Sequence, residues 1–167
     1  MRSDRPVRVV FVCAGNICRS PMAEAVFREQ VSQAGLGDVI EVASRGTEDW
    51  HEGEPPHEGT LAVLDAHGID ARHQRARQIR HRELPEYDYV IALDRSNRDR
   101  LLRMPGADPA RISLLRSWDP AGGELDVPDP YYTGRFQETY ELIRPATEAL
   151  LEAIRRRHLA PAPEGSA

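Results

Sequence analysis

A cysteine and an arginine stand six positions apart near the N-terminus, and their spacing is the first feature that suggests chemistry. Cys13 ends an apolar run, and Arg19 follows a short loop that leads into a helical segment beginning at Ser20-Pro21. A cysteine thiolate is a strong nucleophile. A guanidinium offers a planar fork that matches two oxygens of a phosphate. A nucleophile beside an anion clamp predicts in-line attack on phosphorus through a covalent phosphocysteine.

The residues between these two side chains suit a loop that curls around an anion. Gly15 allows a positive φ or a close backbone approach, and Asn16 is the non-glycine residue that best tolerates the left-handed region. A loop entering a helix presents unpaired N–H groups and the positive end of the helix dipole. The same field, together with Arg19, favours the thiolate form of Cys13. We therefore expect residues 13–19 to bind an anion and to present a reactive thiolate to it.

Strand and helix patterns alternate along the chain and predict how this loop is positioned. Apolar, β-branched runs predict strands at Val7–Cys13, Val39–Ser44, Tyr87–Leu93 and 111–115. Helical patterns follow them at 20–35, 57–67, 96–103 and 135–158, and Ser20 can cap the first of these helices. This order predicts a single α/β domain of parallel strands with helices on both faces of the sheet. Ligands bind such a sheet beyond the carboxyl ends of its strands, which is where Cys13 lies.

Composition excludes several classes of function. All 22 basic residues are arginine and the net charge is −5, so the chain has no overall basic footprint for nucleic acid. Without lysine, a nucleotide-binding loop of the G-x-x-x-x-G-K-[ST] type is impossible. No apolar run is long enough to span a membrane, and two cysteines alone make neither a disulfide framework nor a metal site. We expect a cytoplasmic protein without metal or cofactor.

The chain has the length of one domain. We predict a catalytic domain over residues 6–159 and a disordered tail over 160–167, where the sequence reads APAPEGSA. The segment 117–134 is rich in glycine, proline and aspartate and has no periodicity. Loops of that length inside compact domains are usually functional.

The extended pattern VCAGNICRSPMAEAVF, together with DPYY at 129–132, resembles the low-molecular-weight protein tyrosine phosphatases of the bacterial type. The likeness spans about residues 7–158. It implies a four-stranded parallel sheet and metal-free hydrolysis of phosphotyrosine through phosphocysteine. Cys13 matches the nucleophile, Arg19 the phosphate clamp and Asp129 the general acid. The chemistry also asks for such an acid, because expelling a phenolate needs a proton and hydrolysing the intermediate needs a base.

The resemblance extends to residues around the phosphate. Ser20 matches the hydroxyl that supports the departing thiolate, and the substrate cradle is formed by Ala14, Gly15, Asn16, Ile17 and Cys18. Trp50, Tyr131 and Tyr132 match aromatic walls that accept the substrate ring. Asn16, Ser44 and His73 match a supporting hydrogen-bond network.

Two departures from the family pattern bear on these assignments. The chain reads SRGT where the family commonly has Ser-Ala-Gly-Thr, so Arg45 either adds positive charge near the pocket or points to solvent. The segment GIDARHQRARQI, which contains His73, is one residue longer than the usual spacing.

Particular residues argue against other functions on the same fold. An arsenate reductase would resolve its adduct through two further cysteines late in the chain, and no cysteine follows residue 18. A phosphoarginine phosphatase carries threonine where this chain has Ile17, which favours an aryl substrate. A non-catalytic phosphate-binding module would not need nucleophile, clamp and acid together. The expected partners are phosphotyrosine proteins and inorganic phosphate, which is both product and competitive ligand, and the chain is expected to be a monomer.

Cys18 has two interpretations. It is either a packing residue or a redox partner that forms a disulfide with Cys13 when the enzyme meets peroxide.

Overall fold

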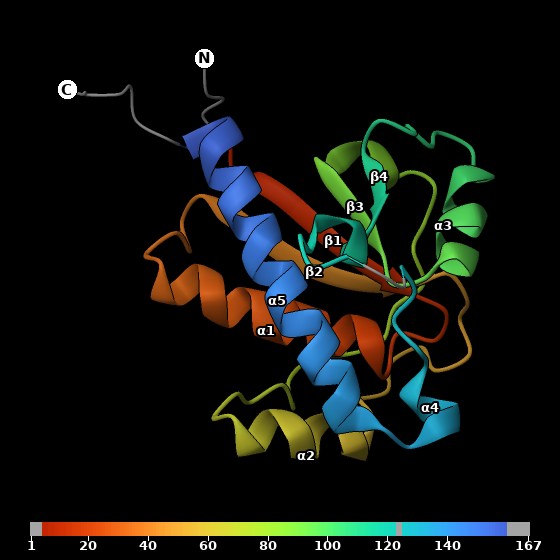
Figure 1. The fold of residues 1–167 in the computed structure, drawn as a ribbon. Coiled ribbons are helices and arrows are strands. Elements are labelled where there is room, and N and C mark those ends of the chain that lie inside the picture. Colours follow the sequence, from red (N-terminus) through yellow and green to blue (C-terminus); the bar gives the residue numbers. More distant parts are fainter. Residues whose placement is uncertain (1–4, 123–124, 160–167) are drawn as a thin grey trace.

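The computed structural model describes residues 5–122 and 125–159, so the tail predicted over 160–167 lies outside the described residues. Its sheet contains four strands, β1 (Val7–Cys13), β2 (Ile40–Gly46), β3 (Tyr89–Ala92) and β4 (Ile112–Leu114). All neighbouring strands are parallel, in the order β2-β1-β3-β4 (Figure 1). The predicted four-stranded parallel sheet is confirmed. Because β1 lies between two other strands, the loop after it is surrounded by neighbouring strand ends.

Helices connect and cover these strands. The α-helices are α1 (Arg19–Gln33), α2 (Glu58–Ala66), α3 (Arg95–Leu102), α4 (Pro130–Thr133) and α5 (Phe136–Ile154). Short 3₁₀ turns lie at η1 (Leu84–Glu86) and η2 (Leu115–Trp118), and a π-helical turn, η3 (Arg155–Leu159), extends α5. The closing helix was predicted as one α-helix from 135 to 158, so its last turn differs from the expectation in type.

The side chains of β1 alternate between two hydrophobic clusters, one on each face of the sheet. Val9 and Phe11 pack with residues of α1 and α5, whereas Val10 and Val12 pack on the other face with Leu101 of α3. All five side chains are fully buried. Figure 1 shows α5 and α1 on one side of the sheet and α3 on the other, which confirms the predicted layers.

The chain also departs from two local expectations. Helix α1 begins at Arg19 with Cys18 at the N-cap position and no side-chain cap, so Ser20 is not the cap that its sequence position suggests. The segment 117–134 is not wholly irregular, because its end forms α4. The Asp129 carboxylate accepts a hydrogen bond from the Tyr131 N–H at 3.1 Å, and Gly134, with a φ of 74°, ends the helix. A helix of four residues is too short to leave a periodic pattern.

Candidate active site

A cavity of about 350 Å³ opens at the carboxyl end of β1. It brings together residues from four separate parts of the chain: the loop after β1, the start of α1, the connection after β2, and the segment before α5. Its lining consists of Cys13, Ala14, Gly15, Asn16, Ile17, Cys18, Arg19, Trp50, His51, Asp129, Tyr131 and Tyr132. All the predicted catalytic residues and all the predicted substrate-binding residues except Ser20 therefore line one cavity.

The loop from Cys13 to Cys18 is held from outside by its carbonyl groups. The Cys13 carbonyl accepts from Thr47 N–H at 2.8 Å, and the Ile17 carbonyl accepts from His57 N–H at 2.7 Å. Among residues 5–122 and 125–159, no group accepts a hydrogen bond from the N–H groups of residues 15–18. With the carbonyls directed outward, these N–H groups are available to an anion.

Two residues of this loop have the conformational roles that the sequence suggests. Asn16 adopts a positive φ of 59°. Gly15 does not, but a Cβ at this position would lie 3.1 Å from Cδ2 of His51. Gly15 therefore serves the close approach of the His51 ring rather than a left-handed turn.

Below the loop, buried polar side chains form a connected network. Ser20 Oγ lies 2.9 Å from Cys13 Sγ, and the Asn16 amide donates to Ser20 Oγ at 2.7 Å and to Ser44 Oγ at 3.1 Å. Asn16 Oδ1 accepts from the backbone N–H of Arg77 at 2.9 Å. These contacts explain why Ser20 does not cap α1: its hydroxyl is directed to the thiol.

His73 does not join this network, which corrects the prediction. Its side chain is exposed, whereas the next residue, Gln74, is buried. Gln74 donates to the Pro21 carbonyl at 3.0 Å and accepts from Arg28 at 3.2 Å. The position that supports α1 from this segment is therefore one residue later than the sequence comparison suggested.

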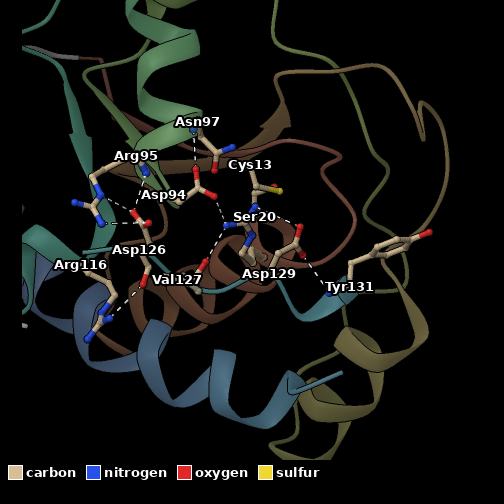
Figure 2. A network of polar contacts seen from close by, with 11 residues as sticks. Cys13, Ser20, Asp94, Arg95, Asn97, Arg116, Asp126, Val127, Asp129 and Tyr131 are labelled. Carbon is tan, nitrogen blue, oxygen red and sulfur yellow. Dashed lines mark hydrogen bonds and ion pairs between the residues drawn. The ribbon is translucent and has the colours of Figure 1, made fainter. Parts of the chain in front are cut away.

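The Arg19 guanidinium is almost fully buried and is oriented by two acceptors on one side. Nη1 donates to Asp94 Oδ2 at 2.7 Å and to the Val127 carbonyl at 2.8 Å. Figure 2 labels both acceptors and the nearby Asp129. Nε has no hydrogen-bond partner among the described residues, and Nη2 lies 3.6 Å from Asp129 Oδ2. Burial acts to lower the pKa of Arg19, but Cys13, Asp94 and Asp129 together outweigh it and raise the pKa. The guanidinium is thus a fixed positive charge with donors left for an anion.

Asp94 is a functional residue that the sequence reasoning missed. It lies just beyond the end of β3, and its other carboxylate oxygen accepts from the Asn97 N–H at 2.7 Å as the N-cap of α3. An aspartate between a buried strand and a helix, at the sheet edge where Cys13 lies, is the signal that could have found it.

The Asp129 carboxylate also lines the cavity, and about 29% of its side chain is exposed. The aromatic residues near it are much more open to solvent, at 62% for Trp50, 53% for Tyr131 and 79% for Tyr132. The Tyr131 ring lies edge-on to His57, with ring centroids 6.0 Å apart. The floor of the cavity, formed by Cys13 and Arg19, is polar and buried. Its mouth, or rim, formed by Trp50, Tyr131 and Tyr132, is aromatic and exposed.

Two other predicted features have plain outcomes. Cys18 is buried, and burial, followed by the nearby Asp129 and Cys13, raises its pKa to about 12, so it is a protonated thiol near neutral pH.

Arg45 neither lines the cavity nor extends freely into solvent. It forms an ion pair with Glu83 at 3.2 Å and donates to the Ser44 carbonyl at 2.8 Å.

The parts of the chain described by the structure contain no cluster of three His, Cys, Asp or Glu side chains that could hold a metal ion. Within the same residues, no helix is both long and apolar enough to cross a membrane.

Comparisons with known proteins agree with one another. The model of the low molecular weight phosphotyrosine protein phosphatases matches residues 8–159. A low molecular weight protein-tyrosine-phosphatase of Streptomyces coelicolor is 51% identical over 89% of this chain and 93% of its own length. The crystal structure of YfkJ from Bacillus subtilis, 43% identical, superposes with a TM-score of 0.88 over 90% of this chain and 96% of that one. A protein tyrosine phosphatase from Entamoeba histolytica, 29% identical, gives 0.84 over 90% and 97%.

Proposed function

The chain belongs to the low molecular weight phosphotyrosine protein phosphatase family, and from this membership we propose that it hydrolyses phosphotyrosine in proteins through a phosphocysteine intermediate. One observation carries the proposal: the Cys13 thiol, the Arg19 guanidinium and the Asp129 carboxylate line a single cavity. These are the nucleophile, the anion clamp and the proton donor that the reaction requires.

In the first step, the Cys13 thiolate attacks phosphorus. The Sγ–P bond forms while the bond between phosphorus and the phenolic oxygen breaks, and Asp129 in its acid form gives its proton to that oxygen. Arg19 holds the equatorial oxygens through the free side of its guanidinium, because Nη1 is already engaged by Asp94 and Val127. The N–H groups of residues 15–18 complete the cradle.

In the second step, a water molecule attacks phosphorus from the side that the phenol has left. Asp129, now ionised, takes a proton from the water as the P–O bond forms. The Sγ–P bond breaks, and Cys13 leaves as a thiolate that Ser20 supports from 2.9 Å. Inorganic phosphate is released, and it also competes with substrate for the same cradle.

The choice of an aryl substrate is supported by the side chains above the floor. Trp50, Tyr131 and Tyr132 provide apolar faces at the cavity mouth, and the branched side chain of Ile17 lines the cavity. Such surfaces suit a flat ring. No described residue specifically favours arsenate reduction, since Cys13 and Cys18 are the two cysteines of the chain.

The proposal is tested by trapping the intermediate. The enzyme is mixed with an aryl phosphate, quenched within one turnover, and the peptide that contains Cys13 is analysed by mass spectrometry. We expect one added phosphoryl group on Cys13 that disappears on a longer incubation, and no added group in Cys13→Ser. Turnover of the aryl phosphate with no phosphoryl group on Cys13 at any time would overturn the covalent mechanism.

We infer further that residues 6–159 form the catalytic domain, which is supported by the family match over 8–159. A cytoplasmic location and a monomeric state stay predictions, to be tested by cell fractionation and by light scattering.

A further inference from the structure

A continuous chain of hydrogen bonds leads from Cys13 away from the cavity to a carboxylate on α1. Ser20 bonds Cys13, Asn16 bonds Ser20 and Ser44, and Ser44 Oγ donates to Glu24 Oε1 at 2.6 Å. All these residues are buried, with exposures of 9% for Glu24 and 5% or less for the others. In such a chain each hydroxyl both donates and accepts, so the direction of every bond depends on what stands at the ends.

At the far end, Glu24 is held as an acceptor. The Arg28 guanidinium, which can only donate, contacts Glu24 Oε2 at 2.5 Å and also donates to the Val42 carbonyl at 2.7 Å. The remaining oxygen, Oε1, therefore accepts the hydrogen of the Ser44 hydroxyl. With its hydrogen committed to Glu24, the Ser44 oxygen faces Asn16 as an acceptor.

In the middle, the orientation of the Asn16 amide is fixed by a backbone group. The atom of Asn16 that meets the Arg77 N–H must be the oxygen, because the N–H is a donor. Nδ2 therefore faces the two serine hydroxyls and gives one hydrogen to Ser44 and one to Ser20.

At the near end, this leaves the Ser20 hydroxyl as a donor. Its oxygen accepts from Asn16, and its own hydrogen has two acceptors in reach, Cys13 Sγ at 2.9 Å and the Arg45 carbonyl at 3.4 Å. The shorter contact is to the sulfur. We propose that Glu24 is a positioning residue, because it holds the Ser44 hydrogen away from Asn16, so that Asn16 stays turned to the Arg77 N–H and Ser20 donates to the Cys13 thiolate.

This inference rests on the proposed role of Cys13 as the nucleophile, and it adds a residue that lies outside the cavity. An amide at position 24 would test it with almost no change in shape. Since Arg28 only donates, it would keep the amide oxygen, and the introduced NH₂ would point at Ser44. The Ser44 hydrogen would then be turned toward Asn16 Nδ2, so two donors would face each other. The Asn16 amide could escape only by rotating, and its oxygen would then draw the Ser20 hydrogen away from Cys13.

The measurement is the pH dependence of Cys13 alkylation by iodoacetamide, with the labelled residue identified by mass spectrometry. A hydrogen bond to a charged group is strong enough that its loss should raise the pH midpoint of alkylation by about 1 pH unit in Glu24→Gln. Ser20→Ala, which removes the final donor, gives the shift in the alkylation midpoint that is expected when the hydrogen bond to Cys13 is lost completely. The matched control is Glu29→Gln on the same helix, whose carboxylate bonds only Gln33 among the described residues and should leave the midpoint unchanged.

A double-mutant cycle separates this role from general support of α1. Ser44→Ala removes the hydroxyl that would turn toward Asn16, so it should change the midpoint little by itself, and Glu24→Gln should add nothing in that background. Additive effects would overturn the proposal, as would an unchanged midpoint in a folded Glu24→Gln. If Glu24→Gln does not fold, Glu24→Ala takes its place, because it also deprives the Ser44 hydrogen of its acceptor. A rise of about 1 pH unit in Glu24→Ala that disappears when Ser44→Ala is added would support the proposal, and an unchanged midpoint would overturn it.

None of these variants replaces another titratable residue of the cavity lining, which besides Cys13 contains Cys18, Arg19, His51, Asp129, Tyr131 and Tyr132. Alkylation needs no phosphate ester, so its outcome does not depend on whether the chain hydrolyses phosphotyrosine. Failure of the proposed function would appear in the trapping experiment, whereas failure of this inference would appear only in the alkylation midpoints.

Discussion

The floor and the rim of the cavity differ in burial and in hydrogen bonding. The floor residues Cys13 and Arg19 are each 3% exposed, and their side chains have hydrogen-bond partners. The rim, formed by Trp50, Tyr131 and Tyr132, is 53–79% exposed. Under the proposed function, we expect the floor to stabilise the same phosphoryl transition state for every substrate and the open rim to let different peptide chains carry the ring. Changes in the floor should therefore reduce turnover, and changes in the rim should alter which substrates are bound.

The most severe test of this division is the removal of the nucleophile. In Cys13→Ser we expect turnover of an aryl phosphate to fall to background, since a serine hydroxyl is not ionised near neutral pH. Phosphate binding, measured by calorimetry, should persist because the clamp and the backbone donors remain. Appreciable turnover in this variant would show that the floor is not the reacting centre.

The next largest effect is expected at the acid. Asp129→Asn keeps an oxygen that can cap α4 but cannot give or take the proton, so the rate with phosphotyrosine should fall on the order of 10²–10⁴. The loss should shrink for a leaving group that departs without a proton. Equal losses with a good and a poor leaving group would mean that another residue is the acid.

The rim should give a smaller effect of a different kind. Replacing Trp50 with alanine should raise KM for a phosphotyrosine peptide by about threefold to tenfold, the usual range for an aromatic contact, with kcat little changed. Leu102→Ala, an exposed apolar residue on α3 that does not line the cavity, is the control. A fall in kcat with an unchanged KM would place Trp50 with the floor instead.

The two cysteines of the loop extend the comparison to oxidation. The pKa of about 12 keeps Cys18 protonated, so peroxide should oxidise Cys13 first. The resulting sulfenic acid is then expected to condense with Cys18, forming an S–S bond and releasing water. In Cys18→Ala, inactivation should be comparably fast, but recovery with a thiol reductant should be several-fold poorer.

Full recovery of Cys18→Ala, together with no loss of two hydrogens from the loop peptide of the oxidised parent, would leave Cys18 as a packing residue.

The smallest expected effect lies at the boundary between floor and rim. Ile17→Thr should raise phosphoarginine activity relative to phosphotyrosine activity by a few-fold, because a hydroxyl replaces part of the apolar wall. The ratio of kcat/KM for the two substrates measures it. An unmoved ratio would assign specificity to Trp50, Tyr131 and Tyr132.

The features predicted well from the sequence are those set by neighbouring residues. The apolar run of β1, the left-handed turn at Asn16 and helix α1, which begins one residue before its predicted start, are all local, so a single stretch of chain reveals them. The ion pair of Arg19 with Asp94 joins residues 75 positions apart. It depends on β3 lying beside β1, which the sequence alone does not specify.

The errors have the same origin. Ser20 has the type and place of a helix cap, but a tertiary contact with Cys13 uses its hydroxyl instead. The choice between His73 and Gln74 depended on counting residues through an arginine-rich segment without periodicity, where one position decides which side chain is buried.

Val127 connects the segment that carries Asp129, the proposed acid, to Arg19, the proposed anion clamp. Its N–H donates to the Leu93 carbonyl at 2.9 Å, and its carbonyl accepts from Arg19 at 2.8 Å. Local opening of this segment would therefore remove one of the two acceptors that hold Arg19 Nη1, so closure of the segment and anion binding at Arg19 are thermodynamically linked. An anion that binds only the closed form lowers the population of the open form by the factor 1 + [L]/Kd. Hydrogen exchange at the Val127 amide would then report the fraction of enzyme with an anion bound, two residues away from the proposed proton donor.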